Sequence, residues 1–272
     1  MSCNESVRQK LPIRMDFTGK VVLITGASSG IGASCALHFA KLSAELALVG
    51  RNVENLKRAA NQCEQASGSK PLIIIADISV EENITRIINE TIDKYGRLDV
   101  LVNNAGIVSV AGVMDDITNF DRLTATNIRG PYILSQQAIP HLIETKGNIV
   151  NVSSIVSTVP IPDMTPYCMT KAAVDMFTKC AALELAPKGV RVNCVNPGPV
   201  ETELFKRAGL DDESNKGLYS GMAASMPLRK YAFSEDVANL IVFLASDSAS
   251  CITGSRHEVD CGLHLGTPPS FK

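Results

Sequence analysis

Short apolar runs alternate along the chain with longer segments in which apolar and polar positions recur at helical spacing. Apolar strands that alternate with helices are typical of a parallel sheet with right-handed crossovers. The pattern therefore predicts an α/β fold, and ligands should bind beyond the carboxyl ends of its strands. The predicted strands span residues 19–24, 45–50, 71–76, 99–106, 147–154, 190–198 and 256–260, and the predicted helices span residues 33–44, 53–65, 80–95, 118–143, 166–186 and 234–246.

At 272 residues the chain is long enough for one large domain or two small ones. It contains no internal repeat, linker or second apolar core, so residues 17–272 are expected to form a single catalytic domain. Residues 1–16 are a slightly basic arm without the apolar stretch of a secretory signal. We predict a cytoplasmic protein, and a role of the arm in organelle targeting stays open.

The first predicted strand runs into the glycine-rich segment TGASSGIG, residues 25–32, which leads into the first helix. Gly26 would permit a tight turn, Gly30 would let the backbone approach a phosphate, and Gly32 would let the helix pack closely on the sheet. The start of the helix offers N–H groups and a positive dipole end to a pyrophosphate. A glycine pattern between a strand and a helix therefore predicts a dinucleotide site.

Arg51 follows the second predicted strand, at the place where a dinucleotide site faces the adenosine ribose. An acid here would bind the 2′-hydroxyl of NAD, whereas an arginine accommodates the 2′-phosphate of NADP. Arg51 therefore favours NADP(H), and the alternative is a solvated arginine that opens the next helix. Asp77, after the third strand, would accept a hydrogen bond from the adenine amino group or would cap a loop.

Ser154, Tyr167 and Lys171 lie where a predicted strand leads into a long helix. Tyr167 and Lys171 are four residues apart and so share one helical face. An adjacent ammonium would lower the pKa of the phenol from its usual value of about 10, which suits general acid–base chemistry. Ser154 would hold a carbonyl oxygen against the phenol. The alternative is a surface pair, because this spacing also arises by chance.

Composition and charge narrow the range of partners. The net charge is −2 without a basic block, which argues against nucleic acid or an acidic membrane surface. The longest apolar runs have the length of a strand, so no membrane span is predicted. Eight cysteines and four histidines show no metal-ligand spacing, which predicts free thiols in a reducing compartment and no metal site.

Six motifs come in the order and spacing of the short-chain dehydrogenase/reductase family, which the chain resembles over residues 17–262. They are TGASSGIG (25–32), NNAG (103–106), Asn127, NVSS (151–154), YCMTK (167–171) and NPGPVET (196–202). The resemblance implies a three-layer Rossmann-type fold with a doubly wound parallel sheet of about seven strands. Cys261 departs from the family, which usually has a glycine there.

The resemblance also implies roles for single residues. Tyr167 would be the catalytic acid/base, and Ser154 would orient and polarise the substrate oxygen. Lys171 would lower the tyrosine pKa and bind the nicotinamide ribose, while Asn127 would hold a water in a proton relay. Together with the glycine-rich segment, the resemblance assigns these residues to the cofactor: Gly26, Ser28, Ser29, Gly30, Ile31, Arg51, Asn52, Asp77, Ile78, Asn104, Ala105, Gly106, Tyr167, Lys171, Pro197, Gly198, Val200 and Thr202.

The sequence thus predicts an NADP(H)-dependent carbonyl reductase or alcohol dehydrogenase. The alternatives are a non-catalytic NADP-binding protein and a dehydratase or epimerase on the same fold. A mostly apolar ketone, aldehyde or secondary alcohol is expected as substrate, with the polar stretch 201–227 as a mobile flap above it. One expected wall of the pocket consists of Ile155, Val156, Val159, Ile161 and Pro162, and the opposite wall of Val108, Val110 and Met114.

Two predicted helices are apolar around more of their circumference than one face of a sheet can cover. They are the helix around residues 127–143 and the helix that begins near Tyr167. Because a monomer rarely exposes so large an apolar patch, a homodimer or homotetramer is expected, as the resemblance also implies. The alternative is that these side chains all pack internally.

Overall fold

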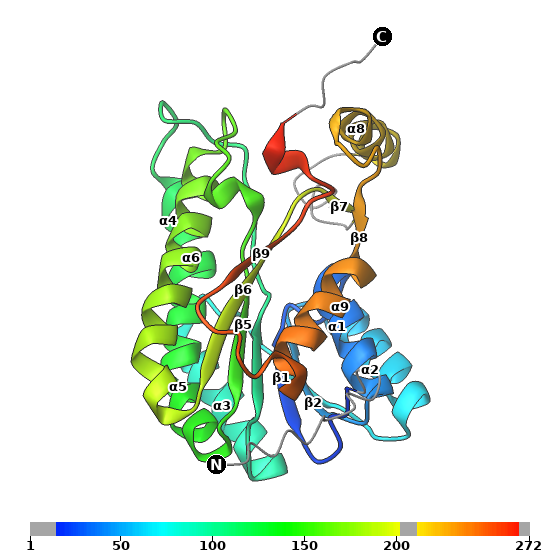
Figure 1. Cartoon of the computed structure of the whole chain (residues 1–272), viewed down its shortest axis with the longest axis vertical. Coiled ribbons are helices and arrows are strands. Elements are labelled where there is room, and N and C mark those ends of the chain that lie inside the picture. The colour runs from blue at the N-terminus through cyan, green and yellow to red at the C-terminus, as the bar shows by residue number, and fades with distance from the viewer. Residues whose placement is uncertain (1–14, 202–210, 267–272) are drawn as a thin grey trace, which may run out of the picture.

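The structure is a computed structural model, and it describes residues 15–201 and 211–266 (Figure 1). Seven parallel strands form one sheet in the order β3-β2-β1-β4-β5-β6-β9. The strands are β1 (Val21–Thr25), β2 (Glu45–Gly50), β3 (Leu72–Ile75), β4 (Val100–Asn103), β5 (Asn148–Val152), β6 (Arg191–Pro197) and β9 (Arg256–Val259). The order reverses between β1 and β4, which is the switch point of a doubly wound sheet. The predicted fold class is confirmed.

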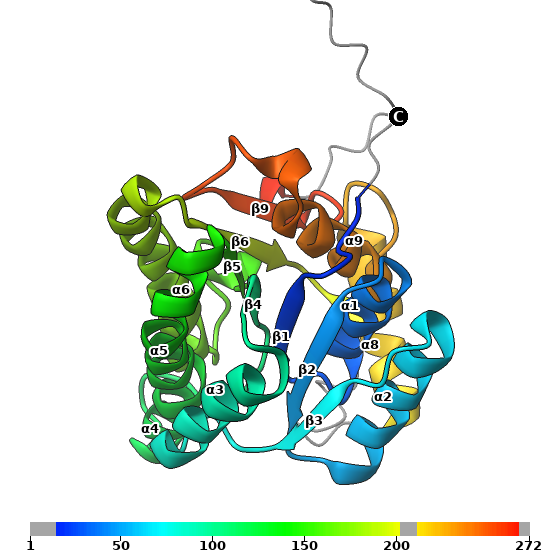
Figure 2. The same cartoon turned by 90° about the horizontal axis from the view of Figure 1, so that it is seen from below.

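Helices cover both faces of the sheet and give three layers (Figure 2). One face packs against α1 (Gly30–Lys41), α2 (Val53–Ser67) and α9 (Ser234–Ala245), and the other packs against α3 (Glu81–Tyr95), α5 (Gly130–Thr145) and α6 (Thr165–Leu185). Further elements are α4 (Thr118–Thr124), α8 (Asp212–Ser225), short helical turns and a small pair of strands, β7 (Val200–Glu201) and β8 (Ala232–Phe233). No helix within residues 15–201 and 211–266 is long and apolar enough to cross a bilayer.

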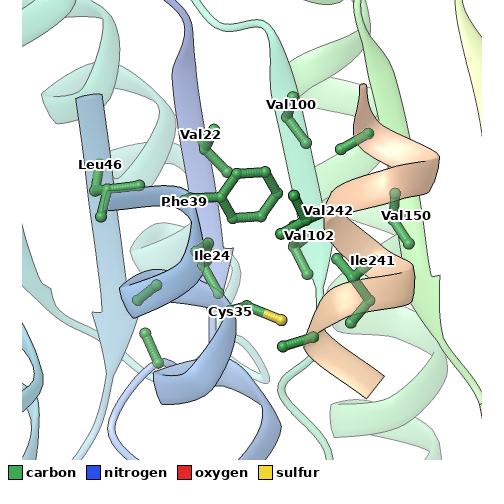
Figure 3. Close-up of a cluster of buried hydrophobic side chains, with 14 of the residues drawn as sticks. Val22, Ile24, Cys35, Phe39, Leu46, Val100, Val102, Val150, Ile241 and Val242 are labelled. Carbon is green, nitrogen blue, oxygen red and sulfur yellow. The ribbon is translucent and has the colours of Figure 1, made fainter. Parts of the chain in front are cut away.

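The period-2 alternation of side chains divides the core between the two faces of the sheet. Val22 and Ile24 of β1 point towards α1 and α9, where they pack with Phe39 (Figure 3). Val21 and Leu23 of the same strand belong to the cluster on the opposite face. Each fully buried aliphatic side chain contributes about 1.5–3 kcal/mol through the hydrophobic effect. Strands that are apolar on both faces therefore hold the sheet rigidly between its helical layers.

The predicted helix 118–143 is interrupted by a π-helical turn at Ala125–Arg129, between α4 and α5. The Gly130 N–H donates to the carbonyl of Ala125, five residues back, rather than four. Pro131 follows and has no N–H to donate to the carbonyl of Asn127, so the regular helical ladder cannot continue through this point. The interrupted turn contains Asn127, the residue inside this helix to which the family resemblance assigns a water of a proton relay.

The helix predicted over residues 234–246 is α9, which begins at Ser234, and Phe233 occupies the N-cap position. The Asp236 carboxylate accepts the Phe233 N–H at 2.8 Å, so an acid in the first turn satisfies the backbone donor that precedes it. The predicted flap contains a helix, α8, which lies beyond the carboxyl ends of the strands (Figure 1).

Candidate active site

A cavity of about 770 Å³ opens at the carboxyl ends of β1 to β6, where the topology places ligands. Residues that follow six strands line it, together with residues from the start of α6. Every residue predicted to bind the cofactor lines this cavity except Thr202, which lies outside the described residues. Its volume lies within the range of small-molecule and cofactor sites in proteins.

The glycine-rich turn between β1 and α1 forms one end of the cavity. Gly26 has a φ of +67°, and a Cβ there would lie 2.8 Å from Asn104 Nδ2, so no larger side chain fits. A Cβ on Gly32 would overlap the carbonyl oxygen of Gly26. Helix α1 begins at Gly30, and its first N–H groups have no intrahelical acceptor. The turn is thus a bare backbone cradle for an anion, and it fits a pyrophosphate.

Asn104 supports this cradle from behind. Its Nδ2 donates to the carbonyl of Thr25 at 2.8 Å and to that of Gly26 at 3.3 Å. Its backbone N–H donates to Thr25 Oγ1 at 3.0 Å, as does the N–H of Ala105. The Asn104 side chain therefore holds the carboxyl ends of β1 and β4 together. Thr25 was not singled out from the sequence, although a hydroxyl at a strand end next to a glycine turn is the relevant signal.

Arg51 and Asp77 lie together at the opening of the cavity, at the same end as the glycine-rich turn. Arg51 Nη1 is 3.3 Å from Asp77 Oδ2, and the arginine side chain is 61% exposed. Burial alone would raise the pKa of Asp77, but hydrogen bonds from Ser79 and the Arg51 charge lower it overall. Asn52, also assigned to the cofactor, uses its Oδ1 to accept the Asn55 N–H and cap α2. An exposed cation at this mouth is available to a phosphate.

Tyr167, Ser154 and Lys171 meet in the middle of the cavity. Lys171 Nζ donates to the carbonyl of Val152 at 3.0 Å and lies 5.7 Å from the centroid of the Tyr167 ring. Ser154 Oγ donates to the carbonyl of Pro197 at 3.3 Å. The three side chains that the sequence placed on a strand end and a helix start are thus neighbours.

The expected lowering of the Tyr167 pKa is wrong for this arrangement. Burial raises the pKa of the phenol to about 12, although a hydrogen bond with Ser154 opposes the rise. Burial also lowers the pKa of Lys171 to about 8, against the pull of the Asp175 charge. Desolvation is the largest effect on the pKa of both groups. The Lys171 ammonium lies over the ring face and donates to the Val152 carbonyl.

Asn127 lies behind this group and does not line the main cavity. Its Oδ1 accepts the Ile107 N–H at 2.9 Å, and its Nδ2 donates to the Ile107 carbonyl at 2.9 Å and to Thr170 Oγ1 at 3.2 Å. The side chain therefore fixes the loop after β4 against α6. Asn127 shares a second, small cavity of about 40 Å³ with Lys171 and Asn103, which is room for about one water.

Comparisons with known proteins identify the family. A family model described as enoyl-(acyl carrier protein) reductase matches residues 26–264. L-xylulose reductase of Caenorhabditis elegans is 37% identical over 258 residues, which cover 93% of this chain and 99% of that protein. The chain belongs to the short-chain dehydrogenase/reductase family.

Two further similarities support the assignment. Glucose 1-dehydrogenase of Gluconobacter oxydans is 35% identical over 258 residues, covering 93% of this chain and 95% of that protein. The structure of L-sorbose reductase from Gluconobacter frateurii, complexed with NADPH and L-sorbose, superimposes with a TM-score of 0.86 at 32% identity, covering 93% of this chain and 99% of that chain. The protein is therefore a short-chain dehydrogenase/reductase, an oxidoreductase that binds a nicotinamide cofactor.

The other end of the cavity in this short-chain dehydrogenase/reductase is apolar and only partly as predicted. Of the expected wall residues, Val108, Ile155, Val156 and Ile161 line it, whereas Val110, Met114, Val159 and Pro162 do not. The loop after β4 turns outwards beyond Val108, because the Ala111 N–H donates to the Asp163 carbonyl at 2.7 Å, and Met114 is left 96% exposed. Ile107, Met164 and Leu263 also line this end and were not predicted from the sequence, whereas Met222 belongs to the stretch 201–227 that was expected above the substrate.

Proposed function

We propose that this oxidoreductase is an NADP(H)-dependent carbonyl reductase, acting reversibly on mostly apolar ketones, aldehydes or secondary alcohols. The observation that carries the proposal is one continuous cavity. A backbone cradle and an exposed arginine lie at one end, Ser154, Tyr167 and Lys171 in the middle, and apolar side chains at the other end. NADP(H) rather than NAD(H) is supported by Arg51 and by the NADPH bound in the L-sorbose reductase structure.

An apolar substrate distinguishes the proposal from the activities for which the relatives are named. L-xylulose and L-sorbose reductases act on sugars, whose hydroxyl groups need hydrogen-bonding partners. Aliphatic and thioether side chains form the wall around Ser154 in this chain: Ile107, Val108, Ile155, Val156, Ile161, Met164, Met222 and Leu263. Such a wall favours a ketone or aldehyde with apolar substituents.

When the cavity holds NADPH, the hydride for the carbonyl carbon would come from its nicotinamide. Tyr167 holds a proton at neutral pH, since burial raises its pKa to about 12, and donates it to the substrate oxygen. Ser154 Oγ, whose proton is donated to the Pro197 carbonyl in this structure, turns this hydrogen bond to the same oxygen and orients it. Lys171, held by the Val152 carbonyl, places a positive charge beside the ring and stabilises the phenolate that forms. Asn127 hydrogen-bonds to the loop after β4 and to α6, and so fixes their relative position beside Ser154, Tyr167 and Lys171.

The test follows nicotinamide absorbance with a panel of carbonyl compounds. The panel pairs apolar ketones and aldehydes with L-xylulose and L-sorbose, and each compound is run with NADPH and with NADH. Faster turnover of the apolar compounds with NADPH is expected. Turnover of the sugars alone would overturn the substrate class, and cofactor binding without turnover of any compound would overturn the carbonyl reductase proposal.

We also propose a homodimer or homotetramer, assembled through the outer faces of α5 and α6. Part of each helix packs internally, as Leu134 of α5 and Leu185 of α6 do. The outer faces still expose Tyr132, Met169, Met176 and Leu183 at 53%, 52%, 58% and 80%. Phe177 packs partly against the core and touches the Tyr132 ring, with centroids 5.6 Å apart. Sedimentation of the parent and of Leu183→Glu tests this assembly, and an active monomer at micromolar concentration would exclude it.

A cytoplasmic location is part of the same proposal. Cys180 and Cys251 are free and exposed, which suits a reducing compartment. Fractionation of cells that express the full chain tests the location, and recovery in a membrane-enclosed organelle would contradict it.

A further inference from the structure

A buried carboxylate lies one helical turn beyond Lys171. Asp175 of α6 is 6% exposed and follows Tyr167 and Lys171 at four-residue spacing, so all three lie along one side of the helix. A buried charge is costly unless it is paired and hydrogen-bonded. The partners of Asp175 therefore indicate what it supports.

Those partners come from β6 and β9. Asn196 Nδ2 is 3.0 Å from one carboxylate oxygen of Asp175 and 3.1 Å from the other. Arg256 Nε is 3.0 Å from Oδ2, although its N–H is not aligned for a hydrogen bond. The guanidinium also donates from Nη2 to Thr158 Oγ1 at 3.3 Å, beyond the turn that carries Ser154. Asp175 thus joins α6 to β6 and β9.

Asn196 contacts both Asp175 and Ser154. Its fully buried Nδ2 also lies 3.1 Å from the Ser154 carbonyl oxygen and 3.1 Å from Ser157 Oγ. An amide nitrogen carries only two protons, so its acceptors fix the plane of the amide. The next residue on β6, Pro197, accepts the Ser154 hydroxyl. The end of β6 therefore holds the Ser154 carbonyl through Asn196 and the Ser154 hydroxyl through Pro197. The hydroxyl has one proton, so when it donates to a substrate oxygen the carbonyl contact with Asn196 is the one that remains.

We propose that Asp175 is a positioning residue for Ser154, which it holds through Asn196 and the turn at residues 154–157. The inference rests on the proposed function, in which Ser154 Oγ binds the substrate oxygen. A displacement of about 1 Å in such a group lowers the rate by up to about 100-fold. Asp175 touches neither substrate nor cofactor in this role.

Kinetics of Asp175→Ala, Asn196→Ala and the double variant test the pathway. Each single variant should lower kcat by about 10- to 100-fold, because the hydroxyl loses its alignment. The dissociation constant for NADPH should stay within about twofold, since Ser154 is expected to contact the carbonyl. The double variant should match Asn196→Ala, because Asp175 acts through Asn196. Asp175→Asn keeps an acceptor oxygen and should recover most of the lost turnover.

Asp99→Asn is a matched control at the opposite end of the sheet. Asp99 is 2% exposed and pairs with Arg97 at 2.7 Å and Lys20 at 3.5 Å, just before β4. Breaking this buried pair should lower Tm without lowering kcat. A purely structural Asp175 would behave in the same way.

Hydrogen exchange supplies a readout that does not need turnover. The Ser157 N–H donates to the Ser154 carbonyl at 3.1 Å, and the Val156 N–H donates to Ser154 Oγ at 3.3 Å. Exchange of these amides should be faster in Asp175→Ala and Asn196→Ala than in Asp99→Asn. A parent that reduces no carbonyl compound would count against the proposed function alone, because exchange still tests the positioning. Unchanged exchange, or losses of kcat that multiply in the double variant, would overturn the inference.

Discussion

The two ends of the main cavity are built from different kinds of sequence. The cofactor end consists of strand ends followed at once by turns and helix starts, such as the segment from Thr25 to Gly32. The apolar end is assembled from the loop after β4, the turn after β5, α8 and the carboxyl-terminal turn. Contacts at the first end are local in the chain or join neighbouring strands, whereas those at the second depend on loops that pack together. The first end can be predicted from short motifs, whereas only half of the residues expected at the second end line it.

Tyr167→Phe should have the largest effect, and it separates the chemistry from both ends of the cavity. The ring still packs, so Tm and the dissociation constant for NADPH should remain close to those of the parent. The exchangeable proton is lost, so kcat should fall by about 10²–10⁴-fold. Steady-state kinetics and calorimetric titration measure the two quantities, and a turnover within tenfold of the parent would refute the role of Tyr167.

The sequence predicted the order of elements and the residues of the cofactor end because both depend on chain-local patterns. Every described residue assigned to the cofactor lines the cavity. The pKa values of the side chains in the middle of the cavity could not be predicted from such patterns. The Tyr167 pKa depends mainly on burial, with an opposing hydrogen bond from Ser154, and burial is not visible in a YxxxK pattern. Asp175 was missed because its partners lie on β6 and β9, far from it along the chain.

Arg51→Ala tests the cofactor end and should rank second. Removal of the guanidinium takes away the cation proposed to pair with the 2′-phosphate, so KM for NADPH should rise by about 10- to 100-fold, while KM for NADH changes little. Lys57→Ala is a suitable control, since Lys57 is an exposed cation of α2 paired with Glu54. Equal KM values for NADPH in Arg51→Ala and the parent would show that Arg51 serves only its pair with Asp77.

The pH dependence of reduction tests the centre of the cavity and should be moderate. Burial lowers the pKa of Lys171 to about 8, so its positive charge is present below that pH and is lost as the pH rises through it. Tyr167 stays protonated in this range because its pKa is about 12. At saturating substrate and cofactor, kcat should be level from about pH 6 to 7.5 and then fall by up to about tenfold per pH unit. A rate that is constant up to pH 10 would contradict the role of the Lys171 charge.

Val156→Thr probes the apolar end and should have the smallest effect. The substitution keeps the shape of the side chain but adds a hydroxyl to a wall with few polar partners. Because an unpaired hydroxyl beside an apolar substrate costs about 1 kcal/mol, kcat/KM for apolar ketones should fall by about 3- to 10-fold.

Met114→Thr is the control for this substitution, because Met114 was also expected from the sequence to line the apolar wall. Met114 is 96% exposed and outside the cavity, so this variant should leave kcat/KM unchanged. The opposite result, with Met114→Thr impaired and Val156→Thr unaffected, would show that the loop after β4 folds inwards over the substrate and that the wall first predicted from the sequence is the functional one.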